Sequence, residues 1–241
     1  MERGVIHGKN KMVIMCVTKR KDLEKIKSSV LNVSKIRDVE SIIEYFKDSK
    51  AIVIACNTAS SIYGLLEEQY DNVYEIIRLT SIHAENISKN KKIGVIATNL
   101  TIELGKYQEY LTNLNTTVYP LKYSELVDII ESKNILTKDE YSTKLNESLK
   151  EKFTYFNNTN IDTLICGCTH FGYVIDYYKK YLGNINYLTS DEVVVNYLNE
   201  KLDLNKVVNP TTTIYTTGDP MEFKEKMKEY DCLGVVNKII I

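Results

Sequence analysis

Two cysteines stand at the ends of apolar segments that have the composition of buried strands. Cys56 closes the segment 51–56 and Cys168 closes the segment 163–168, and each is followed within two residues by a threonine. Two opposed thiols can remove a proton from one face of a carbon and return a proton to the other face. The pair therefore predicts a racemisation or an epimerisation.

Both cysteines lie where a strand is expected to turn into a helix. There the positive end of the helix dipole and the nearby backbone N–H groups favour a thiolate, which is the form that acts as a base. Amide, hydroxyl and imidazole donors follow the cysteines and could cradle a substrate carboxylate, namely Asn57, Thr58, Thr169 and His170. We also expect His170 to assist the proton transfer of Cys168.

Cysteine also fills protein cores, and either motif alone would be as well explained by packing. The matched local sequence of the two segments favours function for Cys56 and Cys168. Cys166 lies on the expected strand and is interpreted as core filling, and Cys16 and Cys232 as packing residues. Cys166, Cys168 and His170 offer too few ligands for a closed structural zinc site, so no metal is expected.

A third segment, residues 94–101, has the pattern of a strand that ends in a hydroxyl-bearing loop and opens a helix. Thr98 and Thr101 could bind a carboxylate through their hydroxyl groups. Threonine is equally common as a helix N-cap, so both roles stay open for these two residues.

Short β-branched runs alternate with amphipathic segments along the chain. Strands are predicted at residues 12–16, 51–54, 73–77, 93–96, 163–166 and 186–188, and helices at 38–46 and 191–198, the latter behind Ser190 as N-cap. Continuous apolar runs indicate strands covered on both faces, and alternating β and α units indicate parallel sheets. Ligands gather at the carboxyl ends of such strands, where both cysteine motifs fall.

We therefore predict an α/β fold with two pseudo-symmetric, doubly wound parallel-sheet lobes and the site between them. The expected lobes comprise residues 1–90 with 206–241, and residues 91–205. The similarity of the two cysteine segments suggests an ancient duplication.

Composition excludes several classes of function. The 241 residues carry a formal charge of -1 and no cluster of basic and aromatic residues, so nucleic acid is not expected as a partner. No apolar run has membrane-spanning length and the beginning of the chain does not have the pattern of a signal sequence. Five cysteines, an odd number without disulfide spacing, predict a cytoplasmic protein.

Three motifs together resemble glutamate racemases of the aspartate/glutamate racemase superfamily. They are Ala-Cys-Asn-Thr-Ala at 55–59, Gly-Val-Ile-Ala-Thr-Asn-Leu-Thr at 94–101 and Gly-Cys-Thr-His at 167–170, and residues 188–192 and 215–220 fit the closing segments. The resemblance runs from about residue 12 to the end. It implies interconversion of L- and D-glutamate without a cofactor, supplying D-glutamate for peptidoglycan.

By this resemblance Cys56 and Cys168 are the two acid–base thiols. Asn57, Thr58, Thr169 and His170 would hold the glutamate. One departure concerns the first β-α unit of the family, whose Asp-Ser-Gly loop has no counterpart here. The nearest remnant is His7-Gly8, and residues 12–20 align better with the second strand of the family.

Two further hypotheses follow from that departure. Beside a glutamate racemase, the alternatives are a catalytically impaired homologue that binds a small acid or a protein, and a related isomerase or lyase that acts on another carboxylate. The loss of one β-α unit also predicts an exposed sheet edge or apolar face, which a second copy of the chain would cover in a homodimer.

Overall fold

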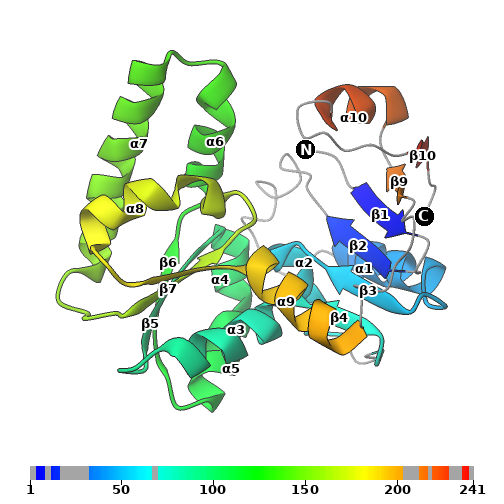
Figure 1. The fold of residues 1–241 in the computed structure, drawn as a ribbon, viewed down its shortest axis with the longest axis horizontal. Helices are drawn as coiled ribbons and strands as arrows, with labels where there is room; N and C mark the ends of the chain where they lie inside the picture. The colour runs from blue at the N-terminus through cyan, green and yellow to red at the C-terminus, as the bar shows by residue number, and fades with distance from the viewer. Residues whose placement is uncertain are drawn as a thin grey trace. The chain divides into compact units, whose positions relative to one another are not determined.

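The computed structural model describes residues 4–8, 12–16, 33–66, 70–202, 212–216, 219–227 and 235–238 (Figure 1). By their contacts the residues form two compact units, Met1–Ile76 with Leu198–Ile241, and Ile77–Tyr197. The lobes expected from the sequence, residues 1–90 with 206–241 and residues 91–205, stay a prediction. Cys232 lies outside the described residues.

The first unit contains a sheet whose described strands follow the order β10-β9-β1-β2-β3-β4. Its elements are β1 (Gly4–Gly8), β2 (Met12–Cys16), α1 (Val33–Tyr45), β3 (Ala51–Ile54), α2 (Asn57–Tyr63), β4 (Val73–Glu75), β9 (Thr212–Thr216), α10 (Pro220–Met227) and β10 (Val235–Lys238). β2, β3 and β4 run parallel, as do β9 and β10.

β1 departs from the parallel pattern, because it pairs antiparallel with both β2 and β9. Only residues 9–11 separate β1 from β2 in the sequence. A parallel pair needs a crossover of a dozen residues or more. A connection of this length therefore favours the antiparallel arrangement.

The second unit contains a sheet of described order β6-β5-β7-β8, with every pair parallel. Its elements are α3 (Ile76–Ile87), β5 (Lys92–Ala97), α4 (Asn99–Leu104), α5 (Lys106–Asn113), β6 (Thr117–Lys122), α6 (Glu125–Glu131), η2 (Ser132–Asn134), α7 (Lys138–Lys152), η3 (Phe153–Phe156), β7 (Thr163–Gly167), η4 (Phe171–Val174), α8 (Ile175–Leu182), β8 (Asn186–Thr189) and α9 (Ser190–Leu202). The mixed α/β class with parallel sheets is confirmed.

Both faces of this second sheet are covered, and the alternation of side chains along the strands decides which residue meets which layer. Ile96, Leu164 and Cys166 pack into an apolar cluster with α6, α7 and α8. Gly167 faces the other way, where a Cβ atom would lie 3.0 Å from the ring of Tyr107 on α5. Figure 1 shows α6, α7 and α8 on one side of β5 and β7, and α3 and α5 on the other.

Two sequence-based details are wrong. The apolar pair Ile76-Ile77 does not extend β4, because α3 begins at Ile76. Ser190 does not cap α9 with its side chain. It is the first residue of the helix, and its buried hydroxyl has no hydrogen-bond partner among the described residues.

Candidate active site

The first candidate half-site follows β3, whose four residues are all buried. Cys56 has an extended backbone and occupies the N-cap position of α2, so the chain turns from strand to helix at the cysteine, as predicted. The reduced thiol is half-buried. Asn57, the first residue of the helix, is buried with 4% of its surface exposed, and Thr58 is half-buried.

Buried hydroxyl groups fix the position of α2. The Ser60 hydroxyl donates to the Ile54 carbonyl at 2.9 Å and accepts from the Ile76 amide at 3.3 Å. The Tyr63 hydroxyl accepts from the Tyr70 amide at 2.8 Å. These bonds tie the helix to the end of β3 and to the start of α3, which holds Cys56 at a defined place.

The second candidate half-site follows β7, again a fully buried strand. Cys166 is 1% exposed, and burial raises the pKa of its thiol above the ordinary range, so this cysteine is a core residue as expected. Cys168 lies just beyond the strand and is half-buried. Thr169 is exposed. The half-site therefore presents one accessible sulfur and one sealed sulfur.

An imidazole and a carboxylate extend from Cys168. The Cys168 Sγ atom lies 3.7 Å from His170 Nδ1. The other ring nitrogen, Nε2, lies 3.2 Å from Glu131 Oε1, within ion-pairing distance. The His170 side chain is 10% exposed, whereas the Glu131 side chain is 36% exposed. Such an array can accept the proton of a thiol and stabilise the imidazolium that forms.

Glu131 was not identified from the sequence. It ends α6, far from residue 170 along the chain, and no local motif marks it. The contact arises because α6 and η4 pack together on one face of the sheet. Only the tertiary structure brings this carboxylate to the histidine.

Thr98 and Thr101 lie at the adjacent strand end. Ala97 on β5 is the registered partner of Gly167 on β7, so Thr98 and Cys168 each follow the last paired residue of neighbouring parallel strands. Thr98 caps α4 by accepting from the Thr101 amide at 3.4 Å, and the two hydroxyl groups lie 2.9 Å apart. Of the two roles left open above, Thr98 therefore has that of a helix N-cap. Thr101 is fully buried.

No group of three or more His, Cys, Asp or Glu side chains in the described part of the chain is arranged to hold a metal ion. No helix among the described residues is long and apolar enough to cross a membrane.

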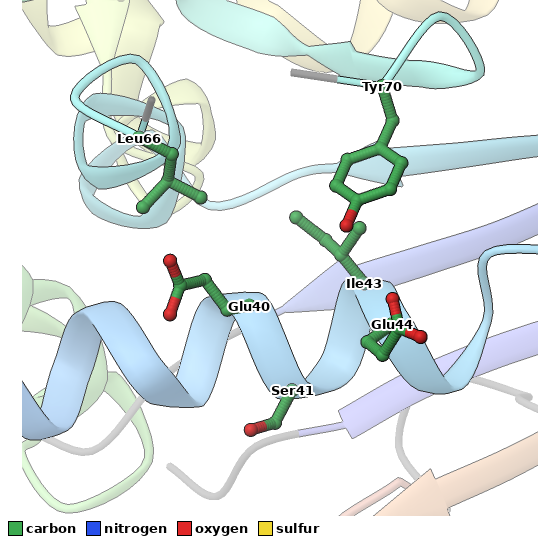
Figure 2. A pocket seen from close by; sticks show the side chains of 6 residues that line it. All are labelled: Glu40, Ser41, Ile43, Glu44, Leu66 and Tyr70. Atoms are coloured by element: carbon green, nitrogen blue, oxygen red, sulfur yellow. The ribbon is translucent and has the colours of Figure 1, made fainter. Parts of the chain in front are cut away.

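Figure 2 shows a hollow in the first unit, with a volume of about 330 Å³, and none of the candidate site residues lines it. It is lined by Glu40, Ser41, Ile43, Glu44, Leu66 and Tyr70.

Curated proteins and solved structures that are similar to this chain include glutamate racemases. The chain is 32% identical over 206 residues to the glutamate racemase of Hydrogenobaculum sp. (strain Y04AAS1), covering 81% of this chain and 77% of that protein. It is 40% identical over 129 residues to the glutamate racemase of Pediococcus pentosaceus, covering 52% of this chain and only 47%, about half, of that relative.

Among solved structures, the crystal structure of glutamate racemase isoform RacE1 from Bacillus anthracis matches with a TM-score of 0.73 and 26% identity, covering 90% of this chain and 85% of that one. No protein-family model matches the sequence.

Proposed function

Because the chain belongs to the glutamate racemase family, we propose that it interconverts L- and D-glutamate with two thiols as acid and base and without a cofactor. The observation that carries the proposal is the array of Cys168, His170 and Glu131 at the carboxyl end of β7. The matching position of Cys56 at the end of β3 supports it.

In this reaction one cysteine, as thiolate, removes the α-proton of the bound amino acid. The opposite thiol gives a proton to the other face of the carbanion, and the two cysteines exchange roles in the reverse direction. The α-proton of an amino acid is weakly acidic, so donors must stabilise the developing negative charge. His170 accepts the proton of Cys168 when the thiolate forms, and Glu131 stabilises the resulting imidazolium.

The substrate carboxylates would bind to donors beside the two sulfurs. We assign this role to Asn57, Thr58, Thr98 and Thr169. Thr169 is exposed, and Thr98 follows the end of β5, which lies beside the end of β7 that carries Cys168, and both facts support contact with a ligand. Thr101 is buried and bonded to Thr98, so its part in binding is to orient the hydroxyl of that residue.

The wider role follows from the family. We propose that the product D-glutamate serves peptidoglycan synthesis, that the enzyme acts in the cytoplasm and that it forms a homodimer.

The test is a stereochemical assay. Purified protein is incubated separately with L-glutamate and D-glutamate, and the circular dichroism signal of the amino acid is followed until it reaches equilibrium. We expect both solutions to converge on the racemate, and Cys56→Ala and Cys168→Ala variants to leave each enantiomer unchanged. Aspartate, hydantoins and maleate are assayed in parallel. Turnover of one of these in place of glutamate would refute the proposed substrate.

A further inference from the structure

The Cys-Gly-Cys sequence brings two sulfurs to the same side of the sheet. Cys166 points away from the face of Gly167, and the alternation of side chains, continued one residue past the end of β7, puts Cys168 on the side of Cys166. The contacts agree, because Cys166 belongs to the apolar cluster under α6, α7 and α8, and Cys168 packs against the same cluster. After burial, the charge of Cys168 is the next cause that raises the pKa of the Cys166 thiol, as expected for neighbouring groups.

A disulfide between the two residues requires the chain to turn at Cys168. Residues two apart on a strand have Cα atoms about 6.6 Å apart, at the upper end of the roughly 4.4–6.8 Å that disulfides span. β7 ends at Gly167, so Cys168 is the first residue after the paired strand. Its backbone has no ladder bond to break and can turn toward Cys166.

The two thiols differ sharply in access. Cys168 is half-buried and lies 3.7 Å from an imidazole nitrogen that can take its proton. Cys166 is 1% exposed and cannot meet a solute directly. An oxidant in solution can therefore attack only Cys168, and Cys166 can react only with its neighbour.

We propose that Cys166 and Cys168 form a reversible oxidation site for hydroperoxides. The Cys168 thiolate attacks the terminal oxygen of the hydroperoxide, an S–O bond forms, and the O–O bond breaks. Cys168 becomes a sulfenic acid, and the peroxide leaves as an alcohol, or as water from hydrogen peroxide, taking the proton released by the thiol.

The Cys166 sulfur then attacks the Cys168 sulfur. An S–S bond forms, the S–O bond breaks, and the hydroxyl group leaves as water with the Cys166 proton. The two thiols lose two electrons in total and one peroxide is reduced. A dithiol reductant reverses the step. The disulfide protects Cys168 from irreversible oxidation and, on the basis of the proposed function, stops racemisation while it lasts.

Peptide mapping tests the site without any assay of racemisation. Reduced full-length protein is treated with one equivalent of hydrogen peroxide, remaining thiols are alkylated, and trypsin releases residues 153–179, which contain both cysteines and no other. We expect this peptide to be two hydrogen atoms lighter than the reduced peptide and to carry no alkyl group. Dithiothreitol should restore both thiols. The matched Cys166→Ala variant should instead retain a sulfenic acid on Cys168 that dimedone traps.

Three results would overturn the proposal. They are a peptide that gains oxygen while Cys166 remains open to alkylation, a disulfide from Cys168 to a different cysteine, and a Cys168 thiol that stays unoxidised. The wild-type result stands even if the Cys166→Ala variant is unstable. Because the readout is chemical, it also separates a failure of this site from a failure of the proposed racemase activity.

Discussion

At the scale of single residues, the contact between His170 and Glu131 orients the imidazole ring beside Cys168. A carboxylate oxygen 3.2 Å from Nε2 stabilises a positive charge on the ring, and the other nitrogen, Nδ1, faces the Cys168 sulfur. The sulfur, the imidazole and the carboxylate lie in series from the half-exposed site toward α6. Glu131 is therefore a positioning residue that acts through the histidine.

Replacing Glu131 by Gln should lower kcat for glutamate on the order of tenfold, the effect of about 1.4 kcal/mol lost from the transition state. KM should change little, because Glu131 acts through His170 and does not itself touch the substrate. The matched control is Glu125→Gln on the same helix, where the lost partner is Lys152. Equal behaviour of the two variants would contradict the role of Glu131.

A second carboxylate has a structural role at the opposite, amino-terminal end of the sheet. Asp162 accepts hydrogen bonds from the Ser88 hydroxyl at 2.6 Å, the Lys89 amide at 2.7 Å, the Asn90 amide at 2.9 Å and the Thr163 hydroxyl at 2.9 Å. Partial burial alone would raise the pKa of Asp162, but these bonds outweigh it and hold the pKa below its usual value.

A group with a lowered pKa in the folded state contributes stability above its unfolded pKa, and this is lost as pH falls through the folded pKa. Asp162→Asn should therefore lower the free energy of unfolding by about 1 kcal/mol at neutral pH, a small value because the carboxylate is partly exposed. Urea titrations should show the gap between variant and wild type closing below about pH 4. A gap that is constant with pH would contradict this account.

At the scale of elements, the carboxyl end of β7 depends on a glycine. A Cβ atom at Gly167 would lie 3.0 Å from each of the Ala97 Cβ, the Ile96 carbonyl oxygen and the Tyr107 ring. Two of these atoms belong to or adjoin the backbone of β5 and cannot move aside. Gly167 thus sets the distance between the strands that carry Cys168 and Thr98.

Gly167→Ala should destabilise the fold by roughly 1–3 kcal/mol and also lower kcat, because the end of β7 must shift. Gly94→Ala is the matched control, since its Cβ would meet only side-chain ends, those of Ile161, Leu164 and Phe156 at 2.8–2.9 Å. It should lower the melting temperature and leave kcat nearly unchanged. A Gly167→Ala enzyme with full kcat would show that strand spacing does not position the thiol.

The sequence predicted those elements whose apolar residues run without interruption. β2, β3 and β7 were expected within a residue of their observed bounds, since strands buried on both faces are continuously apolar. β6 was not predicted, because this edge strand contains Pro120 and its apolar and polar residues do not alternate regularly. β1, with two glycines and a histidine among its five residues, gave no signal either.

The candidate site was predictable to the same extent. Both cysteines and their polar neighbours could be identified, because each motif is contiguous at one strand end. Glu131 could not, because its partner His170 is distant in sequence and only the packing of α6 on η4 joins them. The capping bond of Thr98 could be stated only as an alternative, since a threonine at this position suits a ligand or a helix equally.

At the scale of the whole molecule, we expect two copies of the chain to associate. Sedimentation velocity should give a species of twice the chain mass of 27.7 kDa across the concentrations used for assays. The physical reason is that the described sheet of the first unit has open edges at β10 and β4, which a second copy of the chain can cover. A single species of chain mass at all concentrations would contradict the homodimer.

The account as a whole requires that each thiol act on one face of the α-carbon. Loss of the α-proton signal in D₂O, followed by proton NMR for L-glutamate and D-glutamate separately, tests this most directly. Wild-type protein should exchange the α-proton of both enantiomers and invert both, and Cys56→Ser and Cys168→Ser variants should each lose inversion. Wild-type protein that leaves the α-proton of both enantiomers in place would contradict the central claim.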